Sequence, residues 1–170
     1  SLIKLVYSLN AGEASLRVDF TADWLESGSP ENGIPNLRFV AGTVLGDSTP
    51  VYEIPFGALQ RTRKDDREEP ALRWVMLEAT KEPSSLLVCN DCKYGHAADG
   101  GILRVNLIRS AYSPDPFPEL GQHEASLLIA TVPRGFDRAS ATAIGQAFNH
   151  QPFVVGTDLH EGKWSGENAF

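Results

Sequence analysis

Apolar and polar residues alternate at the start of the chain. Every second residue from Ile3 to Leu9 is apolar, and the same alternation returns from Leu16 to Phe20. A period of two is typical of a strand with one buried face. The segment Asn10–Glu13 between the two runs carries the Asn and Gly residues that turns favour. These runs predict an antiparallel hairpin.

Short apolar or alternating runs bounded by Gly, Pro, Asn and Asp continue along the chain. They are Leu37–Leu45, Val51–Ile54, Leu72–Leu77, Leu86–Cys89, Leu103–Ile108 and Leu127–Val132. Roughly eight strands in this rhythm predict an all-β fold, an antiparallel β-sandwich. A single short helix is predicted over Ala139–Phe148, because Ile144 and Phe148 are four residues apart and His150 and Pro152 follow as stop signals.

Two segments interrupt the strand pattern and are predicted to be loops. Gln60–Glu69 is almost entirely charged, and Ser113–Gly121 contains three closely spaced prolines. We expect a sandwich domain over residues 1–152, and a tail or the start of a following subdomain over 153–170. Because Ser1 leads directly into a strand pattern without an initiator Met, we also expect a boundary inside a longer polypeptide.

The charge of the chain argues against two classes of binding partner. The net charge is -7, and it comes from interspersed acidic and basic residues rather than from one acidic block. Such a surface repels phosphate backbones and anionic lipids, so we expect neither nucleic acid nor membrane as a partner. No apolar run reaches the roughly 20 residues of a membrane span.

A pair of cysteines forms the densest cluster of reactive residue types. Cys89 and Cys92 are three positions apart, and His96 follows, so a metal site or a dithiol is one interpretation. A structural zinc site needs four ligands, however, and the chain has no third cysteine. Residues three apart at the end of a strand also point to opposite faces. We therefore expect no metal ligands here.

Arg109 ends a strand pattern on its apolar side. The apolar residues of the 103–107 run share one face, and Arg109 falls on the same parity. Burial of an unpaired guanidinium costs several kcal/mol, so Arg109 is expected to have a partner. A structural ion pair with Asp91 or Asp115 and a contact with a ligand are both compatible with this position.

No residue pattern in the chain predicts a catalytic site. The four histidines, His96, His123, His150 and His160, are scattered and do not pair as zinc ligands on a helix. Nucleophile motifs are absent, and no apolar frame singles out two carboxylates for acid and base work. We therefore assign no catalytic residue to this chain.

Several longer motifs nevertheless carry a resemblance. Their residues are 90–96 (NDCKYGH), 103–110 (LRVNLIRS), 114–116 (PDP) and 121–124 (GQHE), preceded by 52–57 (YEIPFG) and 70–75 (PALRWV). In order and spacing they resemble the C-terminal half of the α-mannosidases of glycoside hydrolase family 38, in the branch typical of bacterial and cytosolic members. The resemblance covers roughly residues 1–152.

The resemblance implies an accessory domain. It implies part of a galactose-mutarotase-like supersandwich that packs on the catalytic domain of the same polypeptide, a zinc-dependent retaining α-mannosidase that acts on mannose-containing carbohydrate in the cytoplasm. Zinc and the nucleophile are expected in the N-terminal catalytic domain, and no cofactor is expected here. The site candidates that it implies, as a wall of the sugar cleft, are Arg109, Asp91, Lys93, Tyr94 and His96. The alternative is an independent carbohydrate- or protein-binding β-sandwich, and a homo-oligomer is open in either case.

Overall fold

The structure is a computed structural model that describes residues 1–61, 67–117, 119–150, 152–156 and 158. Within these residues the strands are β1 (Leu2–Leu9), β2 (Ser15–Trp24), β3 (Asn36–Gly42), β4 (Ser48–Ile54), β5 (Gly57–Gln60), β6 (Glu69–Pro70), β7 (Trp74–Ala79), β8 (Ser84–Asn90), β9 (Gly95–Asp99), β10 (Ile102–Arg109) and β11 (Gly121–Pro133). One helix, α1 (Arg138–Asn149), follows them. The predicted all-β fold with at most one short helix is confirmed for this part of the chain.

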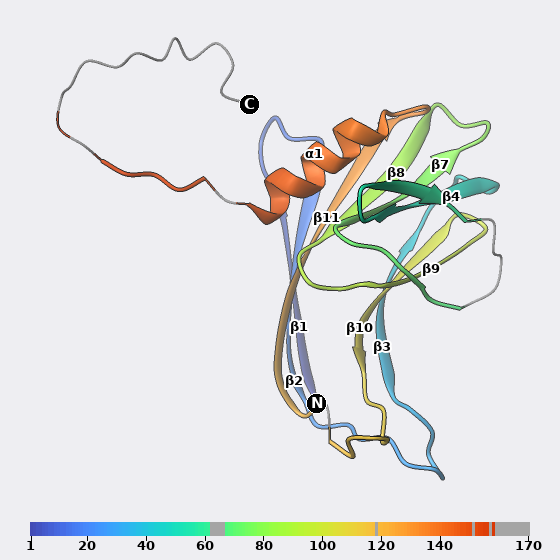
Figure 1. Cartoon of the computed structure of the whole chain (residues 1–170), viewed down its shortest axis with the longest axis vertical. Coiled ribbons are helices and arrows are strands. Elements are labelled where there is room, and N and C mark those ends of the chain that lie inside the picture. The colour runs from blue at the N-terminus through green and yellow to red at the C-terminus, as the bar shows by residue number, and fades with distance from the viewer. Residues whose placement is uncertain (62–66, 118, 151, 157, 159–170) are drawn as a thin grey trace.

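The strands form two antiparallel sheets. The larger sheet has the order β1-β2-β11-β8-β7-β4-β5, and the smaller has the order β3-β10-β9-β6. Figure 1 shows the small sheet beside one face of the large sheet and α1 against the other. The hairpin predicted from the first alternating runs is β1 and β2, which pair from Leu2 with Asp23 to Leu9 with Leu16.

The main hydrophobic core lies between the two sheets. On β2, every second side chain points into it, from Val18 through Phe20 to Trp24. The indole Nε1 of Trp24 donates a 2.7 Å hydrogen bond to Oγ of buried Ser110, which satisfies the only polar atom of that side chain. Alternation on β2 thus follows the period that the sequence shows.

A second core lies between the large sheet and α1. Trp74 and Met76 of β7 point toward the helix, whereas Val75 between them points into the sandwich. The helix begins after Asp137, whose carboxylate accepts from the Ser140 backbone N–H. At Gly145 an added Cβ would lie 3.1 Å from Cδ1 of Trp74. Glycine therefore allows α1 to approach the sheet closely.

The structure differs from the sequence prediction at several elements. Strands β5, β6 and β9 were not expected, and β11 begins six residues before the predicted run at Leu127. The predicted loop 60–69 starts at the end of β5 and ends in β6; its centre, 62–66, lies outside the described residues. The tail prediction falls mostly outside them too. Short strands such as β9, which consists of Gly, His, Ala and Asp residues, have little strand propensity of their own, so pairing with their neighbours decides whether they form.

An ion pair between partly buried Arg73 and buried Glu53 joins β4 to the start of β7. Glu53 is 2% exposed, and its carboxylate accepts from the backbone N–H of Arg73 at 2.7 Å and from the Arg73 guanidinium. The hydrogen bond to Glu53 raises the pKa of Arg73. Both oxygens of a carboxylate that burial would otherwise penalise are therefore satisfied.

We expect Arg73→Ala to destabilise the 170-residue chain by about 3 kcal/mol in urea unfolding, because it leaves the Glu53 carboxylate buried without a cation. The double variant Glu53→Met with Arg73→Met should lose less, since no uncompensated charge remains. Lys81→Ala, an exposed site, is the control and should change stability by less than about 0.5 kcal/mol. Equal losses for Arg73→Ala and Lys81→Ala would contradict this role.

Candidate functional site

Three site candidates, Asp91, Lys93 and Tyr94, lie on the turn from β8 to β9, and His96 lies in β9 itself. Asn90 builds this turn. Its buried side chain accepts the Lys93 backbone N–H at 2.7 Å and donates to the Leu72 carbonyl at 3.0 Å. Its own carbonyl accepts from Nδ2 of Asn149 at the end of α1 at 3.0 Å. One asparagine thus ties the turn to the sheet and to the helix, because each of its polar groups has a partner.

Asp91 is exposed and belongs to a polar network on the helix side of the large sheet. Its Oδ2 accepts from the Ser126 backbone N–H at 2.9 Å, and the Ser126 hydroxyl donates to Asp19 at 2.6 Å. Arg17 donates to the same Asp19 oxygen at 2.8 Å and lies over the Phe148 ring, 5.3 Å from its centroid. The Ser126 hydrogen bond, against partial desolvation, and then the Arg17 contacts lower the pKa of Asp19.

This network was not anticipated. Its residues surround a shallow hollow, whose lining includes Arg17, Asp91, Ser126 and Asn149. The sequence did carry a signal, since Arg17 and Asp19 share the polar parity of the β2 run. What the sequence could not provide is the pairing of β2 with β11, which places Ser126 opposite Asp19. The polar groups of these residues hydrogen-bond to one another, so the network links β2 to β11.

His96 is a core residue and not a surface group. It is 0% exposed, and its Nε2 lies 3.5 Å from Nδ2 of Asn90. Burial lowers the pKa of His96 to about 4, against opposing contributions from the Tyr94 backbone and Glu68. The ring is therefore neutral at pH 7. As a fully enclosed side chain it cannot touch a ligand at the surface of this domain, and we assign it a structural role.

Tyr94 and Lys93 occupy the outer part of the turn. The Tyr94 side chain is 58% exposed, and its backbone carbonyl accepts from the Ala71 N–H at 3.0 Å. Lys93 is half-buried. Of the turn candidates, Asp91 and Tyr94 are the exposed ones, whereas His96 points inward. The turn therefore does not gather its side chains around one point.

The expectation that Arg109 lies on the buried side is wrong. A β-bulge between Asn106 and Ile108 shifts the register of β10 against β3, so that Leu107 and Ile108 are both buried and Arg109 is exposed. The bulge reverses the parity that the 103–107 run establishes. The Arg109 guanidinium has no hydrogen bond or ion pair within the described part of the chain. Being solvated, it needs none.

The two cysteines lie in different environments, Cys89 buried and Cys92 exposed. Cys89 packs in the core under α1, where burial raises the pKa of its thiol to about 12. Burial, together with Asp91, raises the pKa of Cys92 to about 11. Both are free thiols, protonated at neutral pH. Among the described residues, no three His, Cys, Asp or Glu side chains are grouped to hold a metal ion.

The fold and the candidate residues define a class: an antiparallel β-sandwich domain in which Asn90, Asp91 and His96 bond or pack within the domain itself. None of the described helices has the length and apolar character to cross a membrane. Residues 1–117 match the family described as the glycosyl hydrolases family 38 C-terminal domain. The chain belongs to this family.

Several curated proteins are similar to this chain. Alpha-mannosidase 2C1 of Mus musculus is 33% identical over 105 residues, which cover 58% of this chain and 10% of the mouse protein. Alpha-mannosidase of Saccharomyces cerevisiae is 27% identical over 157 residues, covering 87% of this chain and 14% of the yeast protein. The chain thus spans only about a tenth to a seventh of the relatives that it matches.

The environment of His96 generates a pH prediction. The unfolded chain binds a proton at His96 near pH 6.5, whereas the folded chain does so only near pH 4. More protons are bound in the unfolded state between these values, so stability falls as the pH falls. We expect His96 to account for about 2 kcal/mol of the stability lost between pH 7 and pH 5.

Urea unfolding of the wild-type chain, His96→Gln and His123→Gln at pH 7 and pH 5 measures this effect. The wild type and His123→Gln should lose clearly more stability on acidification than His96→Gln. His123 is the control because it is less buried and its Nε2 lies 2.7 Å from the Glu119 carbonyl. An unchanged pH dependence in His96→Gln would remove His96 as its source.

Proposed function

We propose that this chain is the accessory β-sandwich of a zinc-dependent retaining α-mannosidase and packs on the catalytic domain of the same polypeptide. Family membership and the four similar α-mannosidases support the parent activity. Zinc and the nucleophile belong to the catalytic domain in this proposal, and mannose-containing carbohydrate is the substrate. The likeness of residues 52–57 and 70–75 to the branch typical of bacterial and cytosolic members supports a cytoplasmic location in this proposal.

The observation that carries the proposal is the uncovered apolar row on β1. Leu5 pairs with Phe20, and Tyr7 pairs with Val18, whose side chains belong to the main core. The β1 side chains continue this core-facing row, yet Leu5 is 40% exposed and Tyr7 is 56% exposed. Apolar side chains on the core-facing side of a strand that remain exposed to solvent indicate a surface that another protein segment buries. We assign that segment to the remainder of the polypeptide.

The edge of β1 supports the same conclusion. In the described part of the chain, β1 is the outer strand of the large sheet and has no second neighbour. Independent domains protect such edges with charges, prolines or bulges, because an open edge promotes aggregation. Lys4 is the single charged residue of β1. An independent carbohydrate- or protein-binding module would be expected to protect this edge, so the feature favours the accessory role.

A contribution to the sugar cleft belongs to the same proposal. Antiparallel pairing of Val105 with His96 places the end of β10 at the same end of the small sheet as the β8–β9 turn. Arg109 and Tyr94 are both exposed there. A solvated guanidinium and an exposed phenol at this end of the sheet offer hydrogen-bond donors and an aromatic face, groups that suit a carbohydrate. With Asp91, which is also exposed, these two residues are the cleft candidates that the exposure supports.

We expect Leu5→Lys to lower the thermal midpoint of the full-length enzyme, because the lysine would be buried in the contact between domains. Val44→Lys is the matched control, since Val44 is 92% exposed in the segment between β3 and β4. It should leave the midpoint within about 2 °C. Equal midpoints for the two variants would contradict the packing role, and a dimer of full-length chains that Leu5→Lys dissociates would instead assign β1 to a second copy.

We expect Arg109→Ala in the full-length enzyme to lower kcat/KM for an aryl α-mannoside by about tenfold or more, equivalent to roughly 1.4 kcal/mol of transition-state stabilisation. The thermal midpoint should not change, because the side chain is exposed and unpaired within the described residues. Arg134→Ala, another exposed arginine, is the control. Full activity of Arg109→Ala would remove Arg109 from the cleft.

A further inference from the structure

Phe56 has a strained backbone. It is the second residue of the two-residue turn that joins β4 to β5, where Ile54 pairs with Gly57. Its φ is 66°, and no other described non-glycine residue has a positive φ. With Pro55 before it, this is the turn position that normally requires glycine or asparagine. A bulky aromatic residue there is a genuine outlier, and the strain lowers the stability of the domain.

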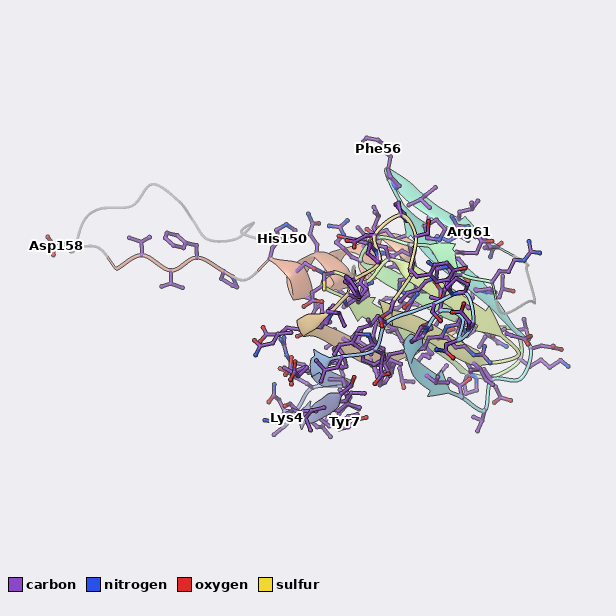
Figure 2. All side chains as sticks on the ribbon, turned by 90° about the horizontal axis from the view of Figure 1, so that it is seen from below. Lys4, Tyr7, Phe56, Arg61, His150 and Asp158 are labelled. Carbon is purple, nitrogen blue, oxygen red and sulfur yellow. The ribbon has the colours of Figure 1, made fainter. Side chains whose placement is uncertain are left out.

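The Phe56 side chain does not contribute to the packing of this domain. The side chain is fully exposed, at 110% of its reference area, and it belongs to neither hydrophobic core. Figure 2 shows it projecting from the tip of its hairpin, on the opposite side of the molecule from Lys4 and Tyr7 of β1. Glycine at this position would remove both the strain and the exposed apolar area. Folding of the domain alone therefore does not explain Phe56.

The surface beside Phe56 has the shape and charge of a contact. A hollow between the β4–β5 hairpin and α1 is lined by Phe56, Leu72, Arg73 and Arg138, among others. Glu53 neutralises Arg73 through their ion pair. Arg138, in contrast, has no ion pair or hydrogen bond through its side chain within the described residues. The lining of the hollow thus includes one positive charge without an ion pair among the described residues and one exposed aromatic ring.

We propose that Phe56 is an anchor that inserts into an apolar pocket on the remainder of the same polypeptide, with a carboxylate of that surface facing Arg138. An exposed aromatic ring next to an arginine is the composition of an interface anchor. The relatives extend far beyond the matched segment, so the partner surface is available within one chain. The inference rests on the proposed function, but it concerns the opposite edge of the large sheet from β1.

The sign of one stability change tests this anchor in the full-length enzyme. If Phe56 is inserted in a pocket, Phe56→Gly empties that pocket and lowers the thermal midpoint by about 2 °C or more. If Phe56 faces solvent, the same variant relieves the strained turn and raises the midpoint. Phe56→Leu should lie between Phe56→Gly and the wild type, because it keeps part of the apolar contact. A raised or unchanged midpoint for Phe56→Gly would overturn the inference.

Controls separate the anchor from its alternatives. Val44→Gly removes another highly exposed apolar side chain, from a residue whose backbone φ is not positive, and it should leave the midpoint unchanged. Arg138→Glu should lower the midpoint at low salt more than at 0.5 M salt, on the order of a screened surface contact. Binding of free mannose that Phe56→Gly abolishes without lowering the midpoint would assign Phe56 to sugar and overturn the anchor.

The same measurements distinguish this inference from the function on which it rests. A lower midpoint for Leu5→Lys with a raised midpoint for Phe56→Gly would retain the accessory role and reject the anchor. Unchanged midpoints for both Leu5→Lys and Phe56→Gly would reject both.

Discussion

Two strands at the centre of the large sheet are buried on both faces, and the rest of the structure is arranged around this requirement. On β7, Val75 and Leu77 face the small sheet while Trp74 and Met76 face α1. A strand of this kind needs a layer on each side, because neither row of apolar side chains can remain in water. The helix after β11 supplies one layer and the small sheet supplies the other.

Burial decreases from the centre of the large sheet toward β1. The strands β7 and β8 are covered on both faces, whereas β1 is largely exposed although every second residue from Ile3 to Leu9 is apolar. An apolar pattern without a cover is the physical signature of a surface that packs elsewhere. At the opposite edge, the strained and exposed Phe56 is a second feature that the domain does not need for itself. Both edges are consistent with the accessory role proposed above.

Most polar residues of the candidate turn make hydrogen bonds or are buried within this domain. Asn90 accepts a hydrogen bond from a backbone N–H of the turn, and Asp91 accepts one from a backbone N–H of β11. His96 lies inside the sandwich. The dense run at residues 90–96 is therefore explained largely by the geometry of the turn and its contacts. What remains exposed for an external ligand or domain is a smaller set, Tyr94 and Arg109 above all.

The sequence by itself determined the all-β class, the first hairpin, α1 and the family, because alternation, helix stop signals and ordered motifs are local properties of the chain. The tertiary structure decided on which face of a strand each side chain lies and which residues contact one another across the sheet. The bulge before Ile108 turned Arg109 outward, and the pairing of β11 with β2 created the Asp19–Ser126 contact. Parity counts residues along one strand, but a bulge is set by the neighbouring strand, and so only the paired sheet fixes which side chain faces the core.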